Sequence, residues 1–78
     1  MKYNSLIEKG GADMNKIRYF RNKKGLSLKD ISDEASIAIG YLSDLERGLR
    51  NNPSKDVMTR IAKVLDETVQ AIFFPEEN

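Results

Sequence analysis

The sequence contains no cysteine, no histidine and no tryptophan among its 78 residues. Disulfide bonds, Cys/His zinc sites and Cys or His nucleophiles are therefore excluded. No apolar run reaches the roughly 18 residues of a membrane span, and the first residues lack the apolar core of a signal peptide. No glycine-rich phosphate loop or metal-ligand spacing is present either. We therefore expect no enzyme activity, no metal or other cofactor, no membrane partner and a cytoplasmic location.

The chain also has little net charge, only +1, but its charges are segregated. Residues 14–29 are basic and contain no acidic residue, and residues 49–65 are basic with a single aspartate. The stretch between them and the stretch after them are acidic on balance. Two basic segments of this kind form either a split phosphate-facing surface or a set of solvated helix faces. Charge alone favours the solvated faces.

Glycine is scarce, and the pair at positions 10 and 11 separates a short head from the rest of the chain. We expect residues 1–13 to be a flexible arm, although their apolar residues also allow one helical turn. Residues 14–75 are expected to form a single domain, because a chain of this size has no room for a second core. Residues 76–78 are an acidic tail.

The apolar spacing from residue 14 onward predicts an all-α domain of five short helices. The first covers about 14–24 and the third about 39–47. The signals that begin or end helices are Gly25, Ser27 with Asp30 in a capping box, Gly48, Ser54, Thr68 and Pro75. The residues expected to face the core are Ile17, Phe20, Leu28, Ile31, Ser32, Ala35, Leu42, Leu45, Leu49, Val57 or Met58, Ile61, Ala62, Leu65, Val69, Ile72 and Phe73.

The second and third helices are joined by very few residues, which predicts the sharp crossing of a helix-turn-helix. A generic helical bundle with a tight turn is the alternative. Ser32 supplies the small residue that this crossing needs, whereas Ser36 stands where glycine is usual. The apolar positions of the motif are occupied by Ile31, Ala35, Ile37, Leu42 and Leu45.

Two blocks carry a resemblance to a known family. Residues 41–48 read Tyr-Leu-Ser-Asp-Leu-Glu-Arg-Gly, and residues 52–54 read Asn-Pro-Ser. With the helix-turn-helix pattern before them, they resemble the Cro/repressor family, the lambda-repressor-like domains of the xenobiotic-response-element type. The resemblance covers about residues 14–74. The resemblance implies a five-helix domain that binds operator DNA as a two-fold dimer. Within the family, the sequence is most similar to the small single-domain repressors of Gram-positive bacteria and their phages.

Arg21 and Glu46 lie on otherwise apolar helix faces, where a lone charge is costly. The resemblance implies that these two residues pair beneath the DNA-binding surface. Arginine can meet a carboxylate with two parallel N–H bonds. In the alternative, each side chain reaches water independently.

The resemblance also implies which residues of the third helix face base edges. Ile39 can touch only a thymine methyl or a sugar, and Gly40 allows a closer approach. Asp44 repels phosphates but can accept a hydrogen bond from cytosine. The expected base-facing residues are Ile39, Gly40, Ser43, Asp44 and Arg47. The expected phosphate contacts are Lys16 or Arg18, then Ser27, Lys29, Tyr41, Asn51, Asn52, Ser54 and Lys55.

A dimer is implied through the fourth and fifth helices, with Val69, Ile72 and Phe74 at the interface, although a minor core contact explains these residues equally well. The resulting prediction is a homodimeric repressor that binds a palindromic operator in double-stranded DNA. The alternative is an antitoxin-like module that mainly binds a regulatory protein partner, because the third helix also offers an apolar and acidic outer face.

Overall fold

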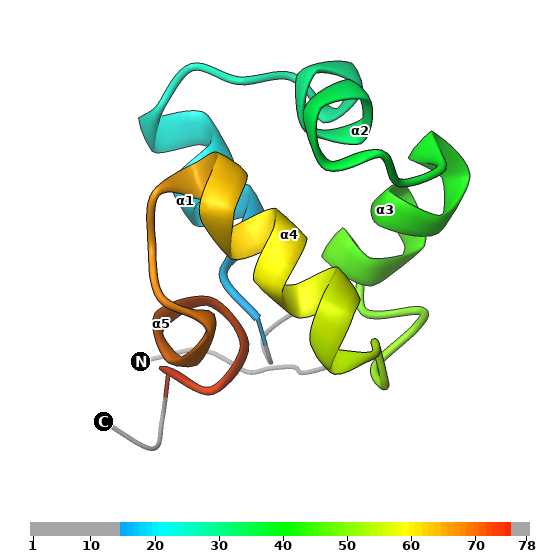
Figure 1. The fold of residues 1–78 in the computed structure, drawn as a ribbon, viewed down its shortest axis with the longest axis vertical. Coiled ribbons are helices and arrows are strands. Elements are labelled where there is room, and N and C mark those ends of the chain that lie inside the picture. Colours follow the sequence, from blue (N-terminus) through cyan, green and yellow to red (C-terminus); the bar gives the residue numbers. More distant parts are fainter. Residues whose placement is uncertain (1–14, 76–78) are drawn as a thin grey trace, which may run out of the picture.

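The computed structural model describes residues 15–75, so the predictions for residues 1–13 and 76–78 lie outside the described residues. Within that range the chain is helical and has no strand, which confirms the all-α prediction. The five helices are α1 (Ile17–Lys23), α2 (Leu28–Ala35), α3 (Ile39–Glu46), α4 (Lys55–Leu65) and α5 (Val69–Phe73) (Figure 1).

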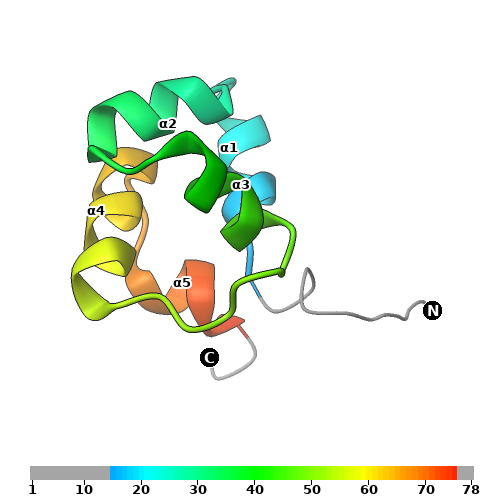
Figure 2. The ribbon, with the colours of Figure 1, turned by 90° about the vertical axis from the view of Figure 1, so that its right-hand side faces the viewer.

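The helices surround one core. α2 packs against α3 and α4, while α5 packs against α4 and α1 (Figures 1 and 2). The α2–α3 pair lies on one side of the molecule, and α5 lies on the opposite side (Figure 1). The buried apolar residues are Ile17, Ile31, Ala35, Ile37, Leu42, Leu45, Ile61, Ala62, Leu65 and Ile72.

The start of α1 and the end of α3 differ from the predicted pattern. α1 begins at Ile17 rather than at residue 14, because Lys16 has a non-helical backbone. Leu49 is 63% exposed, so its prediction as a core residue is wrong. Gly48 adopts a positive φ of 80°, and the N–H of Leu49 then donates back to the carbonyl of Asp44 at 2.8 Å. This reversal turns Leu49 away from the core.

The predicted N-caps are confirmed. The Ser27 hydroxyl accepts from the Asp30 N–H while the Asp30 carboxylate accepts from the Ser27 N–H, a complete capping box. The Ser27 N–H holds the pKa of the Asp30 carboxyl below its usual value. The Ser54 and Thr68 hydroxyls also accept from backbone N–H groups, those of Val57 and Ala71, at the starts of α4 and α5, without the second half of a capping box. Each of these helices therefore starts at the residue that its side-chain chemistry predicts.

The connection from α2 to α3 is the tight turn that the sequence predicts. Ser36 takes the left-handed conformation, with φ 58° and ψ 49°, at the position where glycine is usual. The Ser32 hydroxyl donates to the carbonyl of Ile37 at 2.6 Å, and the Ile37 N–H donates to the carbonyl of Ser32 at 3.0 Å. The small Ser32 side chain thus closes the turn and sets the crossing of the two helices.

Replacing Ser36 by glycine is expected to stabilise the domain. The left-handed conformation costs a residue with a Cβ about 1–2 kcal/mol, and the extra freedom of glycine in the unfolded chain returns part of this. We expect a net gain of about 0.5–1 kcal/mol in urea unfolding. Asp66 has a similar φ of 55°, but aspartate tolerates this region better, so Asp66→Gly should gain less. A loss of stability in Ser36→Gly would contradict the strained-turn interpretation.

Candidate nucleic-acid interface

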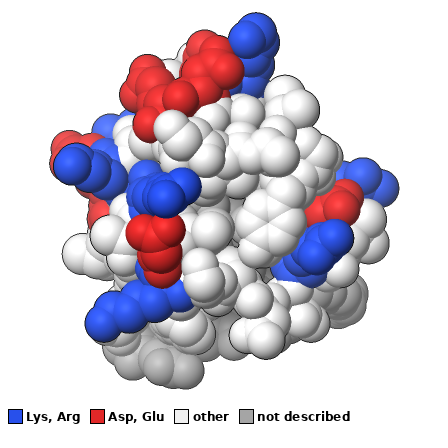
Figure 3. All heavy atoms as spheres, turned by 45° about the vertical axis from the view of Figure 1, so that its right-hand side comes forward, with Lys and Arg blue, Asp and Glu red and all other residues white. Residues whose placement is uncertain are grey.

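The outer face of α3 carries the predicted base-facing residues. Ile39 is 48% exposed and Gly40 and Arg47 are exposed, while Ser43 and Asp44 are half-buried. Because helix neighbours recur every three to four residues, Ile39, Ser43 and Arg47 form one row and Gly40 and Asp44 a second row beside it. Figure 3 turns this side of the molecule toward the viewer and shows a broad uncharged area with charged side chains at its margins.

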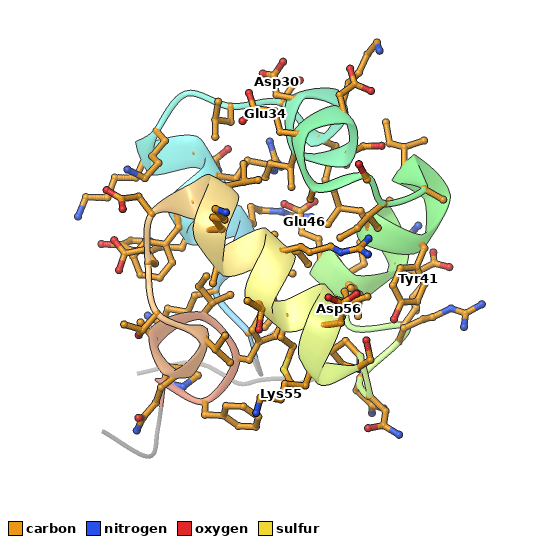
Figure 4. All side chains as sticks on the ribbon, viewed as in Figure 1. Asp30, Glu34, Tyr41, Glu46, Lys55 and Asp56 are labelled. Carbon is orange, nitrogen blue, oxygen red and sulfur yellow. The ribbon has the colours of Figure 1, made fainter. Side chains whose placement is uncertain are left out.

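The end of α3 holds a group of charged residues around Asp44. Its Oδ1 lies 4.0 Å from Arg47 Nη1, and its Oδ2 lies 3.9 Å from Arg50 Nε. The Arg50 guanidinium carbon lies 5.3 Å from the centroid of the Tyr41 ring, which points outward from α3 (Figure 4). Asp44 is thus balanced by two arginines, which weakens its repulsion of phosphates.

Sequence reasoning missed Arg50 as a site residue. It lies in the loop after α3, where no periodicity indicates the direction of a side chain. Its place beside Asn51 and Asn52, both predicted to contact phosphates, was the available signal. The structure brings Arg50, Asn51 and Asn52 together with Tyr41 and Asp44 around one open surface depression. The depression therefore places Asp44, a predicted base-facing residue, beside the predicted phosphate contacts Tyr41, Asn51 and Asn52.

The remaining predicted phosphate contacts fall into two groups. Ser27 and Lys29 lie at the start of α2, and Ser54 and Lys55 at the start of α4, all exposed. Both serine hydroxyls accept from backbone N–H groups, which leaves their own hydrogens able to donate outward. Lys29 also forms an exposed ion pair with Asp33 at 3.0 Å. Surface pairs of this kind are weak, so the lysine can exchange its partner for a phosphate.

The two alternatives at the first helix, Lys16 and Arg18, lie in different surroundings. The backbone N–H of Lys16 donates to the carbonyl of Ile72 in α5, and its ammonium lies 5.0 Å from the centroid of the Tyr19 ring. Arg18 extends toward α3, where its Nε lies 3.5 Å from Glu46 Oε2. The contacts therefore connect Arg18 to the end of α3, whereas they connect Lys16 to α5.

Arg60 is a second basic residue that sequence reasoning did not assign. Its Nη1 donates to the carbonyl of Ser36 at 3.3 Å, and its Nη2 pairs with Asp56 at 3.0 Å. One side chain of α4 therefore braces the turn before α3. The charged i,i+4 spacing to Asp56 was visible in the sequence, but the contact with the turn depends on the tertiary fold.

The predicted pair of Arg21 and Glu46 is confirmed. Glu46 lies in the interior of the domain, among the helices (Figure 4). Glu46 is only 4% exposed, and its Oε2 accepts from Arg21 Nε at 2.9 Å and Nη2 at 2.7 Å. Arg21 Nη1 also donates to the carbonyl of Leu26 at 3.1 Å. Asn15 forms a second connection to α3, because its side-chain nitrogen donates a hydrogen bond to the carbonyl of Leu45 at 2.9 Å. The end of α3 is thereby fixed to α1.

The predicted dimer surface is only partly available. Ile72 is 0% exposed, so its assignment to an interface is wrong: its helical spacing directs it into the core. Val69 is half-buried, and Phe74 is 41% exposed, whereas Phe73 packs against the core. Phe73 and Phe74 also line a small cavity of about 130 Å³ between the end of α5 and the loop that joins α3 to α4. Of the residues predicted for the interface, Phe74 is therefore the most exposed.

Two negative findings apply to residues 15–75. No helix in this range is both long and apolar enough to cross a membrane. The same range contains no group of three or more acidic side chains placed to hold a metal ion.

Comparisons with known proteins agree with this geometry. Residues 17–72 match the helix-turn-helix family. The chain is 37% identical over 57 residues to the HTH-type transcriptional regulator SinR of Bacillus subtilis, covering 73% of this chain but only 51% of SinR, about half its length. It resembles the solved structure of the biofilm master regulator SinR in complex with DNA, with a TM-score of 0.68, 38% identity and coverage of 70% of this chain and 87% of the other. The restriction-modification controller protein C.AhdI from Aeromonas hydrophila gives a TM-score of 0.67 and 30% identity, covering 76% and 94%.

Proposed function

The chain belongs to the helix-turn-helix family, and on this premise we propose that it is a sequence-specific DNA-binding transcriptional regulator. In this proposal α3 enters the major groove of double-stranded DNA, whose width accepts one helix. Occupying an operator is enough to exclude other proteins from it, so the proposed mode of regulation is repression.

The observation that carries the proposal is the layout of the α3 side of the molecule. A helix face of suitable length, with Ser43 and Arg47 as donors, lies between polar groups at the starts of α2 and α4. Base contacts specify a sequence, whereas flanking phosphate contacts set the register and orientation of the protein on the duplex. The arrangement supports both kinds of contact from one surface.

We further propose that two copies bind a palindromic operator. The support is the exposed apolar side chain of Phe74, directly after α5, and the half-buried Val69 at the start of α5. α5 lies on the opposite side of the molecule from α3 (Figure 1), so a contact between two α5 helices leaves both α3 helices accessible to DNA. A two-fold protein then requires a two-fold site with half-sites about one helical turn apart.

Selection of bound duplexes from a random DNA pool tests the proposal. At about 150 mM salt, non-specific phosphate binding is weakened and sequence preference dominates the enrichment. We expect a palindrome to be enriched, with a half-site spacing near 10 base pairs. Failure of every sequence to be enriched would contradict DNA recognition and would favour a protein partner for the outer face of α3.

Asp44→Asn should have a smaller effect on DNA binding through the same surface. The substitution removes a negative charge next to Arg47 and Arg50 but keeps the size of the side chain. We expect binding to random-sequence DNA to strengthen by about 1 kcal/mol, or roughly fivefold, because a repulsive charge is lost near the phosphates. Binding to the selected site should strengthen less, so that the specificity ratio falls. Anisotropy titrations with both duplexes measure this ratio. Unchanged binding to random DNA would place Asp44 away from the duplex.

A further inference from the structure

The start of α3 is occupied by three residues that contribute little to the fold. Ala38 stands at the N-cap without a side-chain hydrogen bond, unlike the capping residues of α2, α4 and α5. Ile39 is exposed and lies outside the core. Gly40 occupies the second position of the helix, although glycine is among the poorest helix formers.

Packing within the domain does not account for Gly40. A Cβ added at this residue would meet no atom within 4 Å, and its φ does not lie in the left-handed region. Glycine at a position that needs neither a special φ nor internal space permits close approach from outside the chain. Local residue choices that oppose the fold are expected at functional sites.

The chemistry of this strip restricts what it can recognise. The side chains of Ala38 and Ile39 have no hydrogen-bonding group, and Gly40 has no side chain, so the side chains of the strip can contact only an apolar group. The nearest donors on the same face, Ser43 and Arg47, are about one and two helical turns further on. Among the base edges in the major groove, the apolar group is the C5 methyl of thymine.

We infer that Ile39 is a specificity-determining residue that contacts the C5 methyl of a thymine, and that Gly40 allows α3 to come close enough for this contact. The inference rests on the proposed function, since it names the base that this part of the DNA-binding surface reads. A contact with a sugar would use the same apolar side chain but would not depend on the methyl group.

The test replaces single thymines by deoxyuridine in the duplex that the selection enriches. Deoxyuridine pairs like thymine but lacks the methyl group. Burial of one methyl group corresponds to about a fourfold change in affinity. We expect replacement of one particular thymine in each half-site to weaken binding of the unmodified protein by about fourfold, with little effect at the other thymines. The inference would be overturned if no replacement of a thymine by deoxyuridine changed the binding affinity.

Two variants assign the effect to Ile39. In Ile39→Ala, the sensitive thymine and deoxyuridine duplexes should bind with equal affinity, because the contact is already lost. The matched control is Leu49→Ala, which truncates another exposed aliphatic residue, one that lies after α3 and lines the depression beside Arg50. It should keep the fourfold discrimination. Discrimination retained in Ile39→Ala would mean that another residue reads the methyl group.

Gly40→Ala tests the close approach with two readouts that move in opposite directions. Alanine is the better helix former and has space for its Cβ, so the Tm should rise. An inserted methyl group in a close contact should weaken binding to the selected duplex by about tenfold. A variant that is more stable and binds as tightly as the unmodified protein would overturn the role of Gly40.

Failure of the inference can be distinguished from failure of the proposed function. If the unmodified protein enriches no sequence, the proposed function fails and the inference fails with it. If it enriches a site that lacks thymine opposite Ile39, or one whose thymines tolerate deoxyuridine, then only the inference is overturned.

Discussion

Glu46→Ala is expected to lower the free energy of unfolding by about 3–5 kcal/mol, the cost of breaking a buried ion pair by removal of one partner. Glu46 is almost fully buried, and its carboxylate accepts both of the short hydrogen bonds from Arg21. Its loss leaves the half-buried guanidinium without a counterion. For a domain of this size, the Tm should fall by at least about 10 °C, as measured by thermal circular dichroism.

The exposed pair of Lys29 and Asp33 provides a matched control. Asp33→Ala also removes a carboxylate from an ion pair with a 3.0 Å contact, but both side chains are exposed. Its cost should be about 0.5 kcal/mol or less. Replacing both buried partners, as in Arg21→Met with Glu46→Leu, should recover much of the stability lost in Glu46→Ala, because no buried charge remains. Equal melting temperatures for Glu46→Ala and Asp33→Ala would contradict a buried pair.

Arg47→Ala is expected to weaken binding to the selected duplex by about 1–3 kcal/mol, the cost of losing a base contact. Arg47 continues the row of Ile39 and Ser43 and is exposed at the end of α3. Removal of a residue that reads a base lowers the affinity of the protein for the selected site more than its affinity for random DNA. Titrations of both duplexes by fluorescence anisotropy, at one salt concentration, measure the two losses.

Arg50→Ala is the comparison for Arg47→Ala. Arg50 lies on the other side of Asp44, stacked over Tyr41 and next to the predicted phosphate contacts. Its removal should weaken binding to both duplexes by a similar factor and should reduce the salt dependence by the equivalent of about one phosphate contact. Equal losses on both duplexes in Arg47→Ala would exclude a base-reading role for Arg47.

Local chemistry made much of the fold predictable. The capping box of Ser27 and Asp30 and the N-caps Ser54 and Thr68 depend only on neighbours in the chain, and all are observed. Ser36 shows the limit of residue type alone: the turn imposes the left-handed conformation even though serine replaces glycine. The motif as a whole therefore determined the geometry at this position more strongly than its residue type.

The errors have physical causes at particular residues. Leu49 continues the apolar spacing of α3, but the helix has already ended and the chain reverses at Gly48. Ile72 was assigned both to the core and to an interface, although one side chain cannot face both. Arg50 and Arg60 were missed because their contacts join different elements, a loop with α3 and α4 with the α2–α3 turn. Such contacts depend on the tertiary fold and leave no periodic signal in the sequence.

Amide chemical shifts recorded during titration with the selected duplex would show whether the outer face of α3 binds DNA. We expect the largest shifts in residues 38–47 and in the caps at Ser27 and Ser54. Residues on the side of α2 that faces solvent, such as Glu34, should change little. Large shifts elsewhere, with the amides of Ile39, Ser43 and Arg47 unchanged at saturation, would contradict DNA binding by this face.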